Sequence, residues 1–431
     1  MSFSLYIHIP WCRNKCLYCD FNSYATRATP WEAYLEALLN ELSAHRHHPF
    51  WRRPLDTLFF GGGTPSLFPP SFYEKLLPAV FDAFPPSPSL ELTLECNPGT
   101  VTRERLRGYH ALGINRLSFG VQSLNPAHLK TLTRIHSPED ARSAVELAWE
   151  EGFTNVSIDL MFGVPGQDEA GWEDELLRAL QWPLTHLSVY NLTPEEGTAL
   201  IKALERGQLH LPDEETLVRM YQRTRTLLRA HGFEPYEISN FSKQRPCQHN
   251  LQYWRGGDYL GLGAGAHSFC QAGILPGLPE EGQPGYRPSP LGVPSEPTGG
   301  TRWWVIKDPA QYQNTCKTGR LPLETHEVLS PREALSELLL TRGRLMEGLP
   351  LDELRQRAGQ RPVQALLERA QPFLRRQLLQ EVGHTLALTD EGVLLADSLI
   401  RALSLALDEA LEREERPQRL SHPRDYKSFP S

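Results

Sequence analysis

Three cysteines near the beginning of the 431-residue chain, Cys12, Cys16 and Cys19, have the spacing C-x3-C-x2-C. Thiolates are soft donors and are the usual protein ligands of iron–sulfur clusters. Three cysteines would leave one iron of a [4Fe–4S] cluster without a protein ligand and open to a small molecule. Structural zinc takes four protein ligands, and no fourth cysteine or histidine stands nearby at a suitable spacing. We therefore expect a [4Fe–4S] cluster here. The alternatives are a zinc knuckle and thiols that bind no metal.

A glycine-rich segment follows the second apolar run of the chain and reads Phe60-Gly61-Gly62-Gly63-Thr64-Pro65. Glycine has no Cβ, so this segment lets the backbone approach a ligand closely and present bare N–H groups. The alternative is a tight turn between a strand and a helix. Because the segment comes after the cysteines, we expect Gly62, Gly63 and Thr64 to belong to the same site.

Glu95 and Gln122 stand at the ends of two later apolar runs. Asp159 stands inside a third apolar run, and Arg134 lies between Gln122 and that third run. A carboxylate in a buried strand needs a partner, which for Asp159 is either a ligand or an arginine in a structural ion pair. Arg134 either forms a bidentate fork with a ligand carboxylate or is an exposed charge on a helix. Glu95 and Asp159 are suited to accept hydrogen bonds from ligand hydroxyl groups.

The first half of the chain alternates apolar runs typical of buried strands with amphipathic runs typical of helices. The expected strands are Phe3–Ile9, Asp56–Phe60, Leu90–Glu95, Arg116–Val121, Asn155–Met161 and His186–Asn191. The expected helices include Trp31–His45, Thr102–Ala111, Pro138–Glu150 and Glu173–Leu180. This alternation predicts parallel βαβ units, and six of them form a partial (βα)6 barrel of the α/β class. Ligands bind at the carboxyl ends of the strands in such sheets, where the candidate residues gather.

The composition of the chain changes after the barrel. We expect a barrel at residues 1–240, a linking region at 241–320 with a Pro/Gly-rich insertion at 271–300, a C-terminal domain at 321–412 and a tail at 413–431. The insertion holds seven prolines and seven glycines, which is typical of irregular chain. The C-terminal domain is expected to be helical and winged-helix-like, because helical runs precede a short hairpin of Leu378–Val382 and Thr385–Leu388.

The formal net charge is −8 and no basic stripe runs along the chain, which argues against nucleic acid as the main partner. No apolar run reaches roughly 18 residues, the length that a membrane-spanning helix needs. The first residues do not resemble a signal peptide. The seven cysteines are an odd number and three crowd together, which favours metal binding in a reducing compartment over disulfides. We therefore expect a cytoplasmic protein without a membrane span.

The cysteine segment, directly after the first strand, resembles that of the radical SAM superfamily, in which S-adenosylmethionine (SAM) binds the open iron of the cluster. Further motifs resemble the oxygen-independent coproporphyrinogen III oxidase family within it. They are Tyr6 to Cys12, Gly61 to Pro65, Glu95 to Pro98, Ser118 to Ser123, Asp159 to Gln167, Tyr236 to Phe241, Asp258 to Ser268 and Leu388 to Gly392. The resemblance covers nearly the whole chain and implies a radical SAM barrel with a [4Fe–4S] cluster and SAM as cofactors.

The resemblance also implies roles for individual residues. Tyr6 and Tyr18 should flank the cluster and the first SAM, and Gly62 and Glu95 should contact that SAM. The positions that bind a second SAM in the oxidases correspond to Gly63, Thr64, Gln122, Arg134 and Asp159.

Two features depart from the oxidases and resemble the HemW branch of the family, the haem chaperones. Phe21 stands where the oxidases keep a fourth cysteine, and Cys12 lies close to the start of the sequence, whereas the oxidases carry an N-terminal extension. The segment His249-Asn250-Leu251-Gln252-Tyr253-Trp254 resembles the haem-binding motif of that branch, and imidazole is a good axial ligand for haem iron. The alternative is that His249 is an ordinary loop histidine.

The resemblance therefore implies a haem chaperone that binds haem and delivers it to an acceptor protein, with the cluster and SAM coupled to delivery. Two enzymatic alternatives stay open. One is oxidative decarboxylation of coproporphyrinogen III by a SAM-derived radical, and the other is radical SAM methylation of haem.

Overall fold

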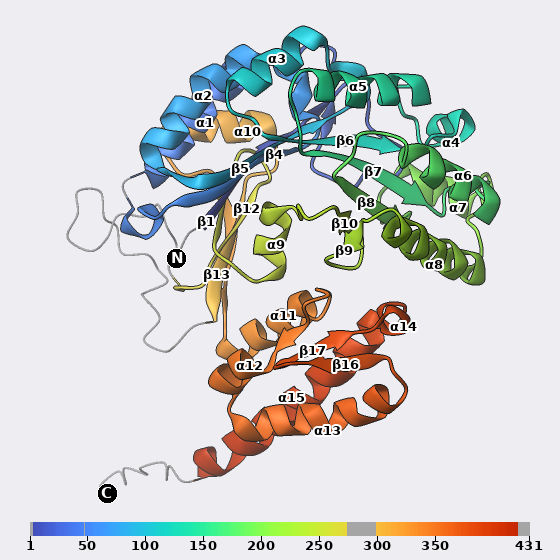
Figure 1. The fold of residues 1–431 in the computed structure, drawn as a ribbon. Coiled ribbons are helices and arrows are strands. Elements are labelled where there is room, and N and C mark those ends of the chain that lie inside the picture. The colour runs from blue at the N-terminus through green and yellow to red at the C-terminus, as the bar shows by residue number, and fades with distance from the viewer. Residues whose placement is uncertain (1–2, 47, 274–298, 421–431) are drawn as a thin grey trace, which may run out of the picture. The chain divides into compact units, whose positions relative to one another are not determined.

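The computed structural model describes residues 3–46, 48–273 and 299–420, and the chain folds into two compact units. The first comprises the chain up to Tyr253 together with Gly257–Val328, and the second comprises Trp254–Gly256 together with the chain from Leu329 onward (Figure 1). Most of the insertion expected at 271–300 and the end of the tail expected at 413–431 lie outside the described residues. The four-part division stays a prediction.

The first unit is built on a twelve-stranded sheet whose middle is parallel. The neighbouring parallel strands are, in spatial order, β11 (Tyr259–Leu262), β1 (Phe3–Ile9), β4 (Leu55–Gly62), β5 (Pro86–Cys96), β6 (Arg116–Gln122), β7 (Val156–Phe162) and β8 (His186–Asn191). One edge continues through β12 (His267–Cys270), β13 (Gly300–Val305) and β14 (Leu323–Leu329), and the other through β10 (Asn240–Ser242) and β9 (Glu234–Pro235). A separate parallel pair consists of β2 (Trp11–Cys12) and β3 (Tyr24–Ala25). This order runs from β14 to β9, so the described sheet is open.

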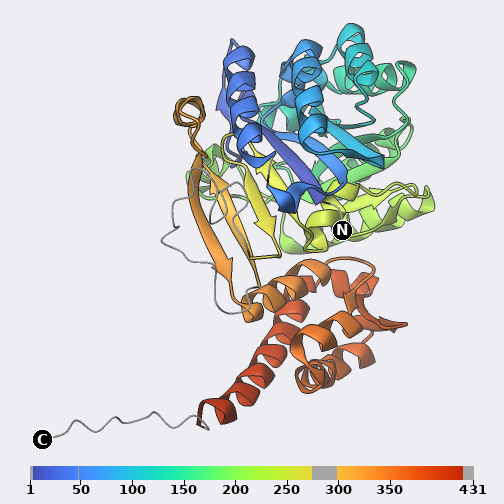
Figure 2. The same cartoon turned by 90° about the vertical axis from the view of Figure 1, so that its left-hand side faces the viewer.

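Helices follow the parallel strands and cover the outer face of the sheet (Figure 1, Figure 2). The helices of this unit are α1 (Trp31–His45), α2 (Pro70–Ala83), α3 (Arg103–Ala111), α4 (Pro126–Thr131), α5 (Pro138–Glu150), α6 (Glu169–Ala179), α7 (Ala199–Glu205), α8 (Glu214–Ala230), α9 (Gln248–Trp254) and α10 (Pro309–Lys317). Short 3-10 helices lie at Pro49–Trp51, Pro65–Leu67 and Pro98–Thr100. The six predicted strand–helix units are present, which confirms the α/β class and the partial barrel.

The parallel strands are largely apolar because the sheet is covered, and parallel strands that are buried on both faces read as nearly continuous hydrophobic runs. In β1 only Tyr6 is partly exposed, and in β7 only Asp159. Glu95 is likewise partly exposed near the end of β5, after four buried residues. These polar positions line cavities on the inner side of the barrel.

The second unit combines helices with a small antiparallel sheet. Its helices are α11 (Pro331–Arg342), α12 (Leu351–Ala358), α13 (Gln360–Arg375), α14 (Asp390–Val393) and α15 (Ala396–Leu420), and its sheet has the order β15 (Leu349–Pro350), β17 (Thr385–Leu388) and β16 (Leu379–Val382). The predicted hairpin is present as β16 and β17, and Gly383 turns the chain between them with φ 60°. The helical C-terminal domain is thereby confirmed.

No helix in the described part of the chain is both long enough and apolar enough to cross a membrane.

Helix α1 holds the loop between β11 and β12 through a buried carboxyl group. Glu41 Oε2 accepts hydrogen bonds from the Gly263 N–H (2.8 Å) and from the hydroxyl of Tyr312 on α10 (2.7 Å). Glu41 is 2% exposed, and burial raises the pKa of its carboxyl to about 7, against 4.5 for an unperturbed side chain.

The Glu41 carboxyl makes stability depend on pH. The folded state keeps the proton to higher pH than the unfolded state, so the free energy of unfolding falls as pH rises from about 4.5 to about 7. We expect a loss on the order of 3 kcal/mol from this group, and we expect the Glu41→Gln variant to lack it. Urea unfolding at about pH 5 and about pH 8 measures the difference. Glu36→Gln, an exposed position on the same helix, is the control, and equal pH dependence in wild type and Glu41→Gln would contradict the assignment.

Candidate functional site

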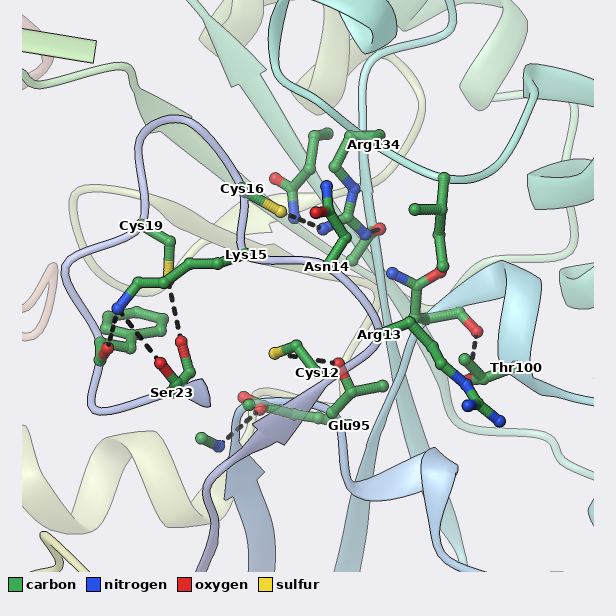
Figure 3. Close-up of a pocket in the computed structure, with 18 of the residues that line it drawn as sticks. Cys12, Arg13, Asn14, Lys15, Cys16, Cys19, Ser23, Glu95, Thr100 and Arg134 are labelled. Carbon is green, nitrogen blue, oxygen red and sulfur yellow. Dashed lines mark hydrogen bonds between the residues drawn. The ribbon is translucent and has the colours of Figure 1, made fainter. Parts of the chain in front are cut away.

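The carboxyl ends of neighbouring parallel strands border one polar cavity beside the cysteine segment, which we call the cysteine cavity (Figure 3). Eleven of the candidate residues line it: Cys12, Cys16, Tyr18, Cys19, Gly62, Gly63, Thr64, Glu95, Gln122, Arg134 and Asp159. Tyr6 and His249 line a neighbouring cavity inside the barrel, the barrel cavity, which also reaches Glu95 and Asp159. The cysteine cavity thus gathers residues from Cys12 to Asp159, about 150 positions apart in the sequence, as parallel strand ends do.

The cysteine segment is fixed to the loop that follows α4. The Leu17 N–H donates a hydrogen bond to Thr133 Oγ1 (2.9 Å), and Asn14 Nδ2 donates to the Thr133 carbonyl (2.9 Å). Thr133 has φ 57°, which is unusual for a β-branched residue and needs support from its surroundings. On the other side, Lys15 Nζ donates to the Ser23 carbonyl (3.2 Å). Both contacts restrict the conformations open to the three cysteines.

Each cysteine sulfur lies close to a polar side chain of the same cavity (Figure 3). Thr64 Oγ1 donates to Cys12 Sγ at 3.4 Å, Arg134 Nη1 donates to Cys16 Sγ at 3.2 Å, and Cys19 Sγ lies 3.7 Å from Ser23 Oγ. Donors aimed at sulfur favour the thiolate that binds iron.

The arrangement of the thiols fits a cluster better than a single ion. Among the described residues, no three His, Cys, Asp or Glu side chains are close enough together to hold one metal ion. Zinc requires ligands that meet at one point, whereas a cubane cluster is bound by thiolates that stand around it. The four remaining cysteines, Cys96, Cys247, Cys270 and Cys316, are buried and lie away from this segment in the sequence.

The glycine turn at the end of β4 touches the end of β1. Gly62 has φ 110°, and its N–H donates to Glu95 Oε2 (3.1 Å). A Cβ on Gly62 would lie 2.5 Å from Cε1 of His8, and a Cβ on Gly63 would lie 2.7 Å from the carbonyl oxygen of Trp11. Packing alone therefore requires glycine at both positions, as expected for a tight turn between a strand and a helix. The backbone of the same turn also lines the cysteine cavity, as a ligand site would require.

His8 is a site residue that sequence reasoning missed. Its Nε2 donates to the Asn22 carbonyl (2.8 Å), so its Nδ1 accepts from the Tyr6 hydroxyl (3.0 Å). Burial lowers the pKa of the imidazole to about 4, which keeps it neutral. The ring thus connects β1 to the chain just after the third cysteine. The available signal was Tyr6-Ile7-His8, where two polar residues alternate within an apolar strand.

Glu95 and Asp159 form a pair of poorly solvated carboxyl groups. Burial, and then the neighbouring Asp159, raises the pKa of Glu95 to about 8. Burial also raises the pKa of Asp159, although Ser118 donates a hydrogen bond to it at 3.4 Å and Arg116 attracts its charge. The site therefore disfavours two negative charges and favours a cationic ligand or ligand hydroxyl groups.

Arg134 points into the cysteine cavity (Figure 3). It is therefore not the exposed helix charge that was the alternative interpretation. Arg134 follows the end of helix α4. The Arg134 guanidinium donates hydrogen bonds to Cys16 Sγ and to the Gly120 carbonyl. Gln122 at the end of β6 has φ 73°, a conformation that non-glycine residues adopt rarely. Tyr18 also lines the cavity and packs against the apolar cluster that contains Leu132.

The structure places His249 inside the barrel. Its Nδ1 shares a hydrogen bond with Thr57 Oγ1 (2.7 Å), its Nε2 shares one with the Tyr253 hydroxyl (2.7 Å), and its ring stacks on Phe59 with centroids 5.0 Å apart. Burial lowers the pKa of the imidazole to about 3. Ligation of haem iron by His249 requires one of these hydrogen bonds to break, so its role as a haem ligand stays a prediction.

Comparison with known families identifies two segments. Residues 6–179 match the profile of the Radical SAM superfamily, and residues 329–395 match that of the HemN C-terminal domain. The heme chaperone HemW of Mycobacterium tuberculosis is 36% identical over 412 residues, which cover 93% of this chain and 94% of that protein. The heme chaperone HemW of Escherichia coli is 42% identical over 266 residues, or 61% of this chain and 69% of that protein.

Among solved structures, the coproporphyrinogen III oxidase HemN of Escherichia coli has a similar fold. The TM-score is 0.74 and the sequence identity 23%, with 94% of this chain and 90% of that chain covered. At this identity the likeness bears on the fold alone.

We expect Cys12, Cys16 and Cys19 each to be indispensable for the cluster. Replacing any one of them by Ala removes a ligand, so reconstituted protein should lose its iron, its sulfide and the EPR signal of the reduced cluster. Cys96→Ala is the matched control, because Cys96 lines the same cavity and should not be a ligand. A full iron and sulfide content in all three variants would refute the assignment.

Proposed function

Because this chain belongs to the HemW haem chaperone family of the radical SAM superfamily, we propose that it binds haem and transfers it to an acceptor protein. The observation that carries this proposal is the likeness to the Mycobacterium tuberculosis heme chaperone over nearly the full length of both chains. Phe21 supports it, because the oxidases that the sequence resembles keep a fourth cysteine there.

We also propose that Cys12, Cys16 and Cys19 hold a [4Fe–4S] cluster that leaves one iron to SAM. When bound, this pair supplies one-electron chemistry through reductive cleavage of the sulfonium. The chain itself orients the pair and excludes water. Tyr6 and Tyr18 flank the site, and the Gly62 backbone and Glu95 contact SAM. The positions proposed for a second SAM are Gly63, Thr64, Gln122, Arg134 and Asp159.

Haem and a haem-accepting protein are the proposed partners, and the cytoplasm is the proposed location. The crowded cysteines support a reducing compartment. The net charge of −8 does not favour nucleic acid as a partner.

SAM binding should depend on the ionisation of Glu95. With a pKa of about 8 this carboxyl is mostly neutral at neutral pH, and the cationic sulfonium of SAM favours its ionised form. We expect the affinity for SAM to rise about tenfold between about pH 7 and about pH 9 and to level off above the pKa. The Glu95→Gln variant should lose this part of the pH dependence. Calorimetric titration of cluster-loaded protein measures it, with exposed Glu104→Gln as the control. Identical pH profiles in wild type and Glu95→Gln would rule out the role.

The haem chaperone and the two enzymatic readings differ in what the protein does to a tetrapyrrole. We expect cluster-loaded protein to bind ferric haem with a saturable Soret change and to pass it to an apo-haemoprotein such as apomyoglobin. We expect no product from coproporphyrinogen III under anaerobic conditions with SAM and a reductant, as followed by chromatography. Protoporphyrinogen IX formed over many turnovers would establish the oxidase instead, and methylated haem detected by mass spectrometry would establish the methyltransferase.

A further inference from the structure

A further cavity, of about 780 Å³, borders the end of the cysteine segment, and we call it the rim cavity. Its volume lies within the range of about 300–1,000 Å³ that is usual for small-molecule sites. It shares Gly62 and Glu95 with the cysteine cavity, together with Lys15, Phe21 and Ser23. An occupant of the rim cavity would therefore lie directly beside the proposed SAM site.

One side chain on the rim cavity is suited to ligate iron. His267 begins β12, is exposed, and packs edge-on against Trp304 with ring centroids 5.6 Å apart. Within the described residues, neither nitrogen of its ring makes a hydrogen bond to the protein. His249, by contrast, uses both of its ring nitrogens inside the barrel. His267 is therefore the histidine that offers a free nitrogen to a ligand on this side of the barrel.

Aromatic rings stand open at the same cavity. Phe21 is 63% exposed and Tyr24 is 39% exposed, and both line the rim cavity. Large aromatic side chains that gather at one opening mark a surface that binds a flat apolar partner. The backbone beneath them is fixed, because Asn22 Nδ2 donates to the carbonyls of Ala264 (3.0 Å) and Lys307 (2.9 Å).

Positive charge borders the cavity. Lys307 is exposed there, and Lys15 uses two of its three ammonium protons for the carbonyls of Phe21 and Ser23, which leaves one for a ligand. Asp20 lies on the same rim and offsets one of these charges. Two ammonium groups next to open aromatic rings suit a ligand that is apolar over its face and carboxylated at its edge.

We propose that the rim cavity is the haem site, with His267 as axial ligand of the iron, Phe21 and Tyr24 against the macrocycle, and Lys307 and Lys15 facing the propionates. This inference rests on the proposed function, because haem is the cargo of a haem chaperone. Haem matches the cavity in each respect, since it has a flat apolar face, two carboxylates and an iron that binds imidazole. His249 then acts as a positioning residue that holds Tyr253, which lines both the barrel cavity and the rim cavity.

Titration of the full-length, cluster-loaded protein with ferric haem tests the axial ligand. The Soret difference spectrum is recorded against the same protein without haem. We expect His267→Ala to bind haem about tenfold more weakly than wild type and to lose the Soret position and the ferric EPR spectrum that imidazole ligation gives in the wild type. Added free imidazole should restore both signals. His210→Ala should keep both signals, because His210 is an exposed histidine that does not line the rim cavity.

A second variant tests the propionate contacts independently of the iron. Lys307→Glu should weaken the binding of haem severalfold and leave the binding of haem dimethyl ester unchanged, because the ester carries no carboxylates. An unchanged affinity and spectrum in His267→Ala, with wild type binding haem, would overturn the proposed site and leave the chaperone function standing. Wild-type protein that binds no haem would instead refute the proposed function, and the haem site with it.

Discussion

The contact between the glycine turn after β4 and the end of β1 is the constraint on which the site depends. Strands β1 and β4 pair in parallel as far as Ile9 and Gly62. The turn then meets Trp11 so closely that a Cβ on Gly63 would lie 2.7 Å from its carbonyl oxygen. Because Trp11 directly precedes Cys12, this contact sets where the cysteine segment leaves the sheet. The three cysteines are therefore positioned by the contact of this backbone turn with the chain that directly precedes them.

Helix α1 extends this constraint to the other side of the site. The Tyr34 hydroxyl donates to the His8 carbonyl (2.7 Å) at the end of β1 and accepts from the Ala264 N–H (2.9 Å) in the loop before β12. The Ala264 carbonyl in turn accepts from Asn22 after the third cysteine. One buried phenol thus ties β1, the cysteine segment and the start of β12 together. The cysteine cavity and the rim cavity have their positions fixed by the same hydrogen bonds.

The sequence predicts the barrel well because covered parallel strands are largely apolar, so that a lone charged residue such as Asp159 stands out in its strand. The sequence does not predict what surrounds His249. The His249 ring is hydrogen-bonded to Thr57 on β4, some 190 residues away in the chain. Arg134 shows the same limit, since its contact with Cys16 arises only because α4 ends at Thr131. Local patterns predict elements and polar strand ends. They do not predict which side chains meet across the sheet.

Gly62 and Glu95 each line the cysteine cavity and the rim cavity. The hydrogen bond from the Gly62 N–H to Glu95 therefore lies in the wall that separates the two cavities. Filling either cavity removes water from this wall and makes an ionised Glu95 more costly, unless the occupant itself carries positive charge. A cation in the cysteine cavity offsets that cost, whereas an apolar ring in the rim cavity increases it. If both cavities are filled, the two occupants would be linked through one carboxyl group. Linkage is reciprocal, so each changes the affinity for the other by the same factor.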